Sequence, residues 1–118
     1  MFKLRSIEDC DLKWLLELHN DPEVLKNLTH PTPVSEDSHM KWWNGIKHNP
    51  KEKRLIFCNE EHDKIGIVKF YSIDHENRNC VLGADIHKDF RGKGFAKPMW
   101  NMMLHHCFDE LNLHRVSL

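Results

Sequence analysis

Residues 85–96 read Asp-Ile-His-Lys-Asp-Phe-Arg-Gly-Lys-Gly-Phe-Ala, a combination that can bind a phosphate through the backbone. Gly92 and Gly94 lack the side chains that would hold an anion away from the main chain, and Arg91 and Lys93 add positive charge beside them. A helical apolar pattern starts directly afterwards. The first turn of such a helix has N–H groups without partners and a favourable dipole. Pro98 is compatible with this position. The stretch predicts an anion-binding loop.

Three other phosphate-binding loops do not fit this stretch. The P-loop pattern G-x-x-x-x-G-K-S/T does not occur in the sequence. The dinucleotide fingerprint G-x-G-x-x-G/A fails at Lys97 and needs a parallel βαβ unit, whereas an antiparallel meander is expected before this loop. A kinase glycine loop would lead into a strand and not into a helix. A plain solvated turn is the remaining alternative, so the neighbouring elements decide.

The chain begins with a pattern for a short strand and a helix. Residues 2–5 form the expected strand, and Asp9 or Asp11 can cap the helix that follows. One apolar face of that helix is formed by Leu12, Leu15 and Leu16.

Two further helices are expected before the meander. Asp21 caps a second helix with Pro22 at its first position, and this helix must be short because residues 29–33 contain two prolines and form a loop. Ser35 caps a third helix over residues 36–48.

The period then changes to that of strands. Residues 54–58, 64–73 and 80–86 predict three strands joined by polar turns, which gives an antiparallel meander. A long helix over residues 95–111 follows the glycine loop, and residues 113–118 begin a final strand. The main order is β-α-α-β-β-β-α-β. The apolar stripe of the long helix consists of Ala96, Met99, Trp100, Met103, Leu104, Cys107, Phe108 and Leu111.

Residues 91–96 resemble the acetyl-CoA signature Q/R-x-x-G-x-G/A of the GNAT N-acetyltransferases and match it in full. The order of elements around the loop is also that of the family. Residues 73–80, leading to Leu82-Gly83, look like the branch that acetylates ribosomal-protein N-termini, polyamines and nucleotide-linked amino sugars. The resemblance implies an α/β (α+β) acyl-CoA N-acyltransferase fold, with a mixed, mostly antiparallel sheet flanked by helices. It makes acetyl-CoA the expected co-substrate.

The resemblance also implies where acetyl-CoA would lie. In this family the strand before the signature separates from the next parallel strand, and pantetheine pairs with the exposed backbone. Here Ile86, His87 and Lys88 would contact pantetheine, and the acetyl thioester would lie near residues 84–86. The pyrophosphate would be held by Arg91, Gly92, Lys93, Gly94, Phe95 and Ala96.

The implied reaction is direct attack of a neutral amine on the thioester carbonyl, with a backbone N–H stabilising the oxyanion. One group must take a proton from the ammonium and another must give one to the thiolate. Many relatives carry a glutamate base near the position of Val81, which cannot act as a base. Asp85 or His87 could substitute, as could residues 75–76 (His-Glu) through water. We expect His87 to be an exposed loop residue.

The second departure concerns the acid and the end of the chain. The family's acid is a tyrosine on a helix after the final strand, whereas the sequence ends at Leu118 and its one tyrosine, Tyr71, lies in the meander. We expect that the family's last helix and hairpin are missing. The apolar strand at residues 113–118 would then be an open edge through which two copies could pair. On the acceptor side, residues 20–43 would contribute a stacking wall from Trp42 and Trp43, although one of the two tryptophans is expected in the core.

The composition of the 118 residues is that of one globular domain, with 40% hydrophobic and 30% charged residues. We therefore expect a single domain over residues 1–118. The formal net charge of -1 excludes a dedicated nucleic-acid binder and gives little support to a polycationic substrate. No apolar run approaches the roughly 18 residues of a membrane helix, and the first residues lack a secretory apolar region. We expect a cytoplasmic protein with no membrane partner.

The cysteines and histidines do not indicate a metal site. Cys10, Cys58, Cys80 and Cys107 lie in periodic segments without C-x-x-C spacing, which is typical of reduced core thiols. Residues 105–107 (His-His-Cys) are helix neighbours that point in different directions, and structural sites need four converging ligands.

Three functions remain open at this level. The first is acetyl transfer to a primary amine, with an amino sugar on a nucleotide slightly ahead of a protein N-terminus. The second is a non-catalytic acyl-CoA-binding or regulatory module, or a fragment of a longer acetyltransferase. The third is a nucleotide-phosphate-binding domain, which the meander makes the least favoured.

Overall fold

The computed structural model describes residues 2–26, 33–110 and 115–117. The chain divides into two compact units, one formed by Met1–Ser6 with Pro50–Leu118 and the other by Ile7–Asn49. Each unit is described by itself. In the described part, every helix is too short or too polar to serve as a membrane span. The loop predicted at residues 29–33 lies outside the described residues, apart from Pro33.

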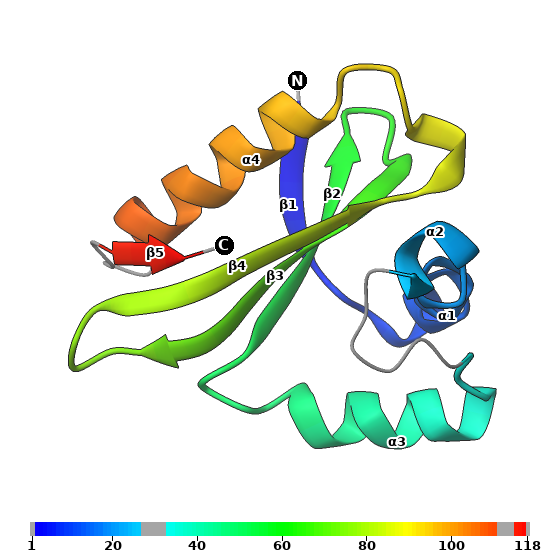
Figure 1. The fold of residues 1–118 in the computed structure, drawn as a ribbon, viewed down its shortest axis with the longest axis horizontal. Coiled ribbons are helices and arrows are strands. Elements are labelled where there is room, and N and C mark those ends of the chain that lie inside the picture. The colour runs from blue at the N-terminus through cyan, green and yellow to red at the C-terminus, as the bar shows by residue number, and fades with distance from the viewer. Residues whose placement is uncertain (1, 27–32, 111–114, 118) are drawn as a thin grey trace. The chain divides into compact units, whose positions relative to one another are not determined.

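The first unit contains a sheet that, in the described residues, has five strands in the order β1-β2-β3-β4-β5 (Figure 1). The strands are β1 (Phe2–Ser6), β2 (Lys53–Asn59), β3 (Lys64–Asp74), β4 (Asn79–Ile86) and β5 (Arg115–Ser117). The first four are antiparallel neighbours, and β5 runs parallel to β4. This confirms the predicted meander and the mixed, mostly antiparallel sheet.

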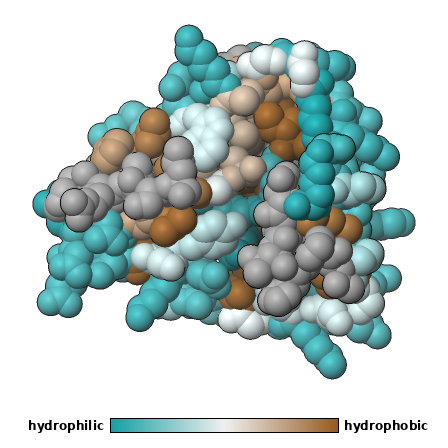
Figure 2. Space-filling model, viewed as in Figure 1, coloured by the Kyte–Doolittle hydropathy of each residue, from teal (hydrophilic) through white to brown (hydrophobic). Residues whose placement is uncertain are grey.

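One face of the sheet packs against helix α4 (Ala96–His105), which runs beside the sheet in Figure 1. Burying a large apolar side chain there contributes about 1.5–3 kcal/mol. In the view of Figure 2 most of the coloured surface is hydrophilic, with smaller hydrophobic patches between. The buried cluster consists of Leu55, Phe57, Ile65, Val68, Phe70, Ile73, Cys80, Leu82, Met99, Met103 and Cys107.

Helix α4 is shorter than predicted, because the α-helix ends at His105 and a π-helical segment, η3 (His106–Glu110), follows. A π-helix places more residues in each turn and therefore rotates the apolar stripe off the core. Met103 and Cys107 remain fully buried, but Phe108 is 43% exposed, so its predicted place in the stripe is wrong. The predicted stripe member Ala96 is exposed too, at the first turn. Leu111 lies outside the described residues.

Gly66 holds the end of β4 close to β3. It pairs with Ile86, and a Cβ at this position would collide with the backbone carbonyl of Asp85. Glycine in a strand interior often marks such a close backbone approach. The β2–β3 register also shifts between Phe57 and Cys58, beside this point. Gly66 thus fixes where β4 ends and where the loop after it begins.

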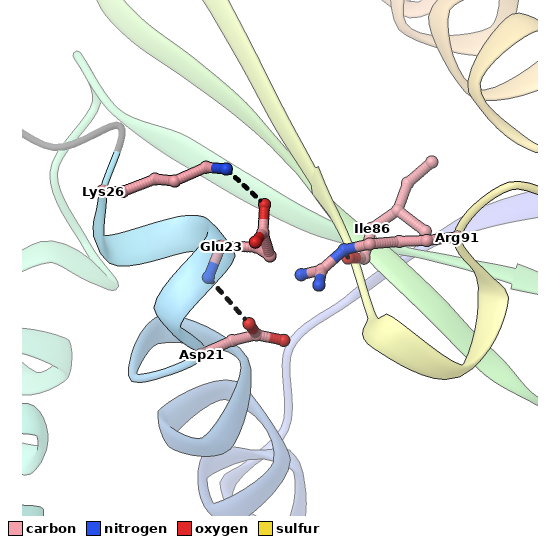
Figure 3. A network of polar contacts seen from close by, with 5 residues as sticks. All are labelled: Asp21, Glu23, Lys26, Ile86 and Arg91. Carbon is pink, nitrogen blue, oxygen red and sulfur yellow. Dashed lines mark hydrogen bonds and ion pairs between the residues drawn. The ribbon is translucent and has the colours of Figure 1, made fainter.

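Within its described residues, 7–26 and 33–49, the second unit contains the short η1 (Asp9–Asp11) and three helices, α1 (Leu12–His19), α2 (Pro22–Leu25) and α3 (Glu36–Ile46). The predicted caps are confirmed for α2 and α3. The Asp21 carboxylate accepts a hydrogen bond from the N–H of Glu23 (Figure 3), and Ser35 Oγ accepts one from the N–H of Ser38. Lys26 also forms an ion pair with Glu23 at 2.6 Å, which Figure 3 shows across α2.

The apolar face of α1 differs by one position from the prediction. Leu12, Leu15 and Leu18 are buried, whereas Leu16 is only half-buried. The α1 and α3 ends are connected by the side chain of Asn20. Its amide donates to the carbonyl of Val34 at 2.9 Å and accepts from the N–H of Val34 at 2.8 Å.

Three of the four cysteines are buried thiols, as predicted, but Cys10 is exposed. It lies in η1, before the amphipathic part of α1 begins, so the helical period does not turn it inward. Cys80 and Cys107 lie with their sulfur atoms 3.8 Å apart in the core of the first unit. Burial raises the pKa of both thiols, that of Cys107 to about 12 with a further contribution from Cys80.

Candidate functional site

The predicted anion loop begins where β4 leaves the sheet. The N–H of His87 donates to the carbonyl of Ile65 at 2.8 Å, which is the last backbone contact before the loop. The chain then turns through η2 (Lys88–Phe90), closed by a 2.9 Å bond from the N–H of Phe90 to the carbonyl of His87. The loop therefore starts from a fixed backbone position.

Arg91 is turned back onto the strand that precedes it. Its Nε donates a 2.9 Å hydrogen bond to the carbonyl of Ile86, as Figure 3 shows. The side chain is half-buried, and this hydrogen bond braces the turn. The sequence predicts that Arg91 helps to hold the pyrophosphate and that Ile86 contacts pantetheine. It does not predict the hydrogen bond between these two residues.

Gly92 and Gly94 have the backbone conformation that the prediction requires. Their φ angles are 73° and 84°, in the left-handed region that favours glycine. A Cβ at either position would have no heavy atom within 4 Å, so the space above the loop is open. Glycine is therefore needed here for the turn and not for close packing.

The loop delivers the chain to an uncapped helix. Phe95, at the N-cap position of α4, forms no side-chain cap hydrogen bond, and the N–H of Met99 bonds to the carbonyl of Phe95 at 3.2 Å. Ala96 and Lys97 consequently carry first-turn N–H groups without partners inside the helix. The ring of Phe95 meets those of Phe2 and Phe90 edge-on, at centroid distances of 5.8 and 5.7 Å. These contacts anchor the loop on the core.

The cationic side chains around this helix start can add charge to the site. Lys88 and Lys93 are exposed, and Lys97 lies in the first turn of α4 and is exposed as well. An anion above Gly92 and Gly94 would meet the positive end of the helix dipole together with these ammonium groups. The arrangement can bind a phosphate or pyrophosphate.

Asp85 lies one residue before Ile86 and is already paired. Its carboxylate forms an ion pair with the ammonium of Lys69 on β3, with only 23% and 17% of the two side chains exposed. The contact follows from the register, because Ile67 pairs with Asp85 and Lys69 pairs with Gly83. The sequence pattern alone does not single out Lys69 as a partner of Asp85. The alternation of strand residues was a usable signal, but only the register identifies the partner.

His87 is buried, with 6% exposure, so the expectation of an exposed loop histidine is wrong. Its Nδ1 accepts a 3.2 Å hydrogen bond from the N–H of Asp89, and the Asp89 carboxylate lies 3.5 Å from the same nitrogen. An acceptor nitrogen carries no proton, and the backbone donor fixes this assignment. The ring therefore caps η2.

The second unit has a small pocket of its own, with a volume of about 130 Å³. It is lined by His19, Val34, His39 and Trp42. The rings of His39 and Trp42 stack at 5.1 Å, and His19 lies 6.5 Å from His39. Burial, and then the nearby His19, lower the pKa of His39 below its usual value. Trp43 is in the core and Trp42 is 36% exposed, which confirms the division expected for the two tryptophans.

The comparisons with known proteins agree with this geometry. Residues 2–118 match the model of the acetyltransferase (GNAT) domain family. The chain therefore belongs to that family.

Curated N-acetyltransferases resemble the chain along almost its whole length. The chain is 28% identical over 115 residues to a spermidine N(1)-acetyltransferase of Vibrio cholerae, covering 98% of this chain and 66% of the relative. It is 33% identical over 118 residues to the uncharacterized N-acetyltransferase p20 of Bacillus licheniformis, covering 97% and 66%. The chain spans about two thirds of the length of these curated relatives.

A solved structure supports the fold at the same level. Spermidine N-acetyltransferase from Vibrio cholerae in complex with CoA and spermine superposes with a TM-score of 0.91 at 28% identity, covering 98% of this chain and 68% of that one. The predicted GNAT-like fold is confirmed.

Proposed function

We propose that this protein transfers an acetyl group from acetyl-CoA to a primary amine. One observation carries the proposal: the open loop at Gly92 and Gly94, with positive φ angles, leads into the uncapped N-terminus of α4. A pyrophosphate is the doubly anionic group that this combination suits. Membership of the acetyltransferase (GNAT) domain family supports CoA as its carrier.

The proposed roles follow the chain. Residues Arg91 to Ala96 hold the pyrophosphate, and the backbone of Ile86, His87 and Lys88 lies beside pantetheine. In the described residues β5 pairs only with Asn79–Val81 of β4, which supports an extended partner along Leu82–Ile86. The acceptor amine then attacks the thioester carbonyl near residues 84–86, where a backbone N–H stabilises the oxyanion.

Two residues near the proposed thioester site, Asp85 and His87, are candidates for the base of this reaction. Asp85 would have to exchange its ion pair with Lys69 for the ammonium of the acceptor. His87 uses Nδ1 as an acceptor for Asp89, so it fits a structural role better than proton transfer. Of the two, Asp85 remains the better candidate, and His87 contributes by shaping the loop.

For the acceptor we propose an uncharged or singly charged amine and keep the amino group of a nucleotide-linked sugar ahead of a protein N-terminus. The Vibrio cholerae relative acts, by its name, on spermidine. The formal net charge of -1 gives little support to a polycationic substrate. A panel of amines including spermidine tests this choice.

A non-catalytic acyl-CoA-binding module is the second candidate function. The specific observation in its favour is that both candidate bases are engaged by Lys69 and Asp89. A thiol-release assay with acetyl-CoA and the amine panel separates the two functions, because only the enzyme releases thiol. Calorimetry with CoA and with ADP completes the test. Equal affinity for the two ligands would show that pantetheine contributes nothing and would contradict a CoA site.

Two finer points belong to the same proposal. We propose a cytoplasmic location, since Cys80 and Cys107 lie 3.8 Å apart as free thiols and acetyl-CoA is a cytoplasmic co-substrate. We also propose that two copies associate through β5, which is the edge strand of the described sheet next to β4. A related Vibrio cholerae spermidine N-acetyltransferase has a dodecameric structure. Sedimentation of the purified protein tests the assembly.

A further inference from the structure

The sheet face opposite α4 brings Tyr71 onto the strand that leads to the loop. Tyr71 pairs with Val81, and Lys69 pairs with Gly83, so the side chains of positions 69, 71, 81, 83 and 85 share one face. The Tyr71 ring leans diagonally over Gly83. A Cβ on Gly83 would lie 3.1 Å from Cε2 and 3.2 Å from the hydroxyl oxygen of Tyr71. The absence of a side chain at Gly83 therefore lets the Tyr71 ring approach β4 closely.

The ring is held from its other side by Arg54. The guanidinium carbon lies 5.2 Å from the ring centroid, within the range of a cation–π contact. Tyr71 is half-buried, and in the described residues its hydroxyl has no hydrogen bond. The phenol is thus placed rigidly, but its polar end is available.

The position of that hydroxyl relative to the loop can be estimated from strand geometry. Pantetheine is about as long as four or five residues of strand at about 3.3 Å each. An arm that starts at a pyrophosphate above Arg91–Ala96 and runs back along β4 therefore ends beside residues 83–86. Gly83, under the Tyr71 hydroxyl, lies at this end.

We propose that Tyr71 is the acid of the reaction, an inference that rests on the proposed acetyl transfer. The acceptor nitrogen forms a bond to the acetyl carbon, and the carbon–sulfur bond breaks with its electron pair on sulfur. The phenol proton passes to this thiolate, directly or through one water, and gives CoA thiol. The phenolate recovers a proton from solvent, which receives the one lost by the acceptor ammonium. The sequence alone set Tyr71 aside, because only the strand register brings it to β4.

The test uses the full chain and three variants. Tyr71→Phe keeps the ring over Gly83 and removes only the hydroxyl. Gly83→Ala keeps the hydroxyl and displaces the ring. Val81→Ala, directly opposite Tyr71 on the same face, is the control for disturbing this surface. Each is assayed for kcat, for KM of acetyl-CoA, for CoA affinity by calorimetry, and for the pH profile of kcat.

We expect Tyr71→Phe to lower kcat by about 100-fold or more with unchanged CoA affinity, the range of general acid catalysis. The alkaline side of the pH profile of kcat should also change in this variant, because the proposed proton donor has been removed. Gly83→Ala should lower kcat similarly, and Val81→Ala should leave kcat within about threefold of the wild type.

A Tyr71→Phe protein with wild-type kcat and an unchanged pH profile would overturn the inference and leave the ring as a cover for Gly83. That result would leave the proposed acetyl transfer intact. A wild-type protein that does not bind CoA overturns the proposed function, and the role of Tyr71 is lost with it.

Discussion

The ammonium of Lys69 on β3 and the carboxylate of Asp85 on β4 form an ion pair on the sheet face opposite α4. The two side chains are diagonal neighbours in the antiparallel register, and both are mostly buried. Lys69 also lies directly across from Arg54 in the β2–β3 register, so two positive charges are neighbours there. The carboxylate of Asp85 neutralises the charge of Lys69. Asp85 thus has a structural task beside any chemical one.

Replacing Asp85 by Asn should separate these two tasks. We expect the free energy of unfolding to fall by about 1–3 kcal/mol, since the Lys69 charge is left mostly buried without its partner. The double variant Asp85→Asn/Lys69→Met should recover most of that loss in urea denaturation. If Asp85 is also the base, kcat stays low in the double variant. Restored kcat would exclude Asp85 as the base.

The glycine loop is tested by Gly94→Glu. A glutamate at φ 84° costs about 1–2 kcal/mol of backbone strain and places a carboxylate where the pyrophosphate is proposed. We expect CoA binding to fall below detection in calorimetry while circular dichroism still shows a folded chain. Gly45→Glu is the matched control, because Gly45 in α3 also has open space around its Cα. Unchanged CoA affinity in Gly94→Glu would contradict the loop assignment.

His39 should make stability depend on pH. Its pKa is lowered in the folded protein by burial and by His19, from a usual value of 6.5. Below about pH 6.5 the unfolded chain therefore binds more protons than the folded one, and stability falls as the pH falls toward the folded pKa. Above that range the contribution is constant. Urea unfolding at pH 7.5 and pH 5.5 measures the difference.

The variant His39→Gln should show a smaller loss of stability between these two pH values than the wild type. His48→Gln is the control, since His48 is exposed just after α3. Equal pH dependence in the wild type and in His39→Gln would show that another group is responsible.

The thiols should react with a disulfide reagent in two classes. Cys10 is exposed, whereas Cys58, Cys80 and Cys107 are buried. With a pKa of about 12, Cys107 has a thiolate fraction of about 10⁻⁴ at pH 8. We expect one of the four thiols to react promptly and the others to react at the rate of unfolding. Cys10→Ser should remove the prompt phase. A second prompt thiol would contradict the buried placement.

Local sequence patterns predicted the features that local physics decides. Ser35 and Asp21 are confirmed as caps, because a short oxygen-bearing side chain before a helix satisfies the first free N–H groups wherever it occurs. Gly92 and Gly94 are confirmed at positive φ for an equally local reason, since few other residues adopt it without strain.

Features that depend on register and packing were not predictable in the same way. The burial of His87 follows from two hydrogen bonds, one from its N–H to the carbonyl of Ile65 and one from the N–H of Asp89 to its Nδ1. The residue types at these positions do not predict either bond. The exposure of Phe108 follows from a π-helical segment, which the apolar pattern of the surrounding sequence does not predict. The neighbours of Lys69 and Tyr71 could be identified only from the register in which β3 pairs with β4. A slip of one residue in that register would place both side chains on the opposite face of the sheet.

The two hydrogen bonds between Asn20 and Val34 have a consequence for how this protein can vary. A side-chain amide that donates to the carbonyl and accepts from the N–H of one residue bonds as a paired strand residue does, so it joins two chain positions 14 apart at a single point. Position 20 should therefore accept few replacements, because aspartate, which lacks the donor, would leave the carbonyl of Val34 without this partner and should open the junction.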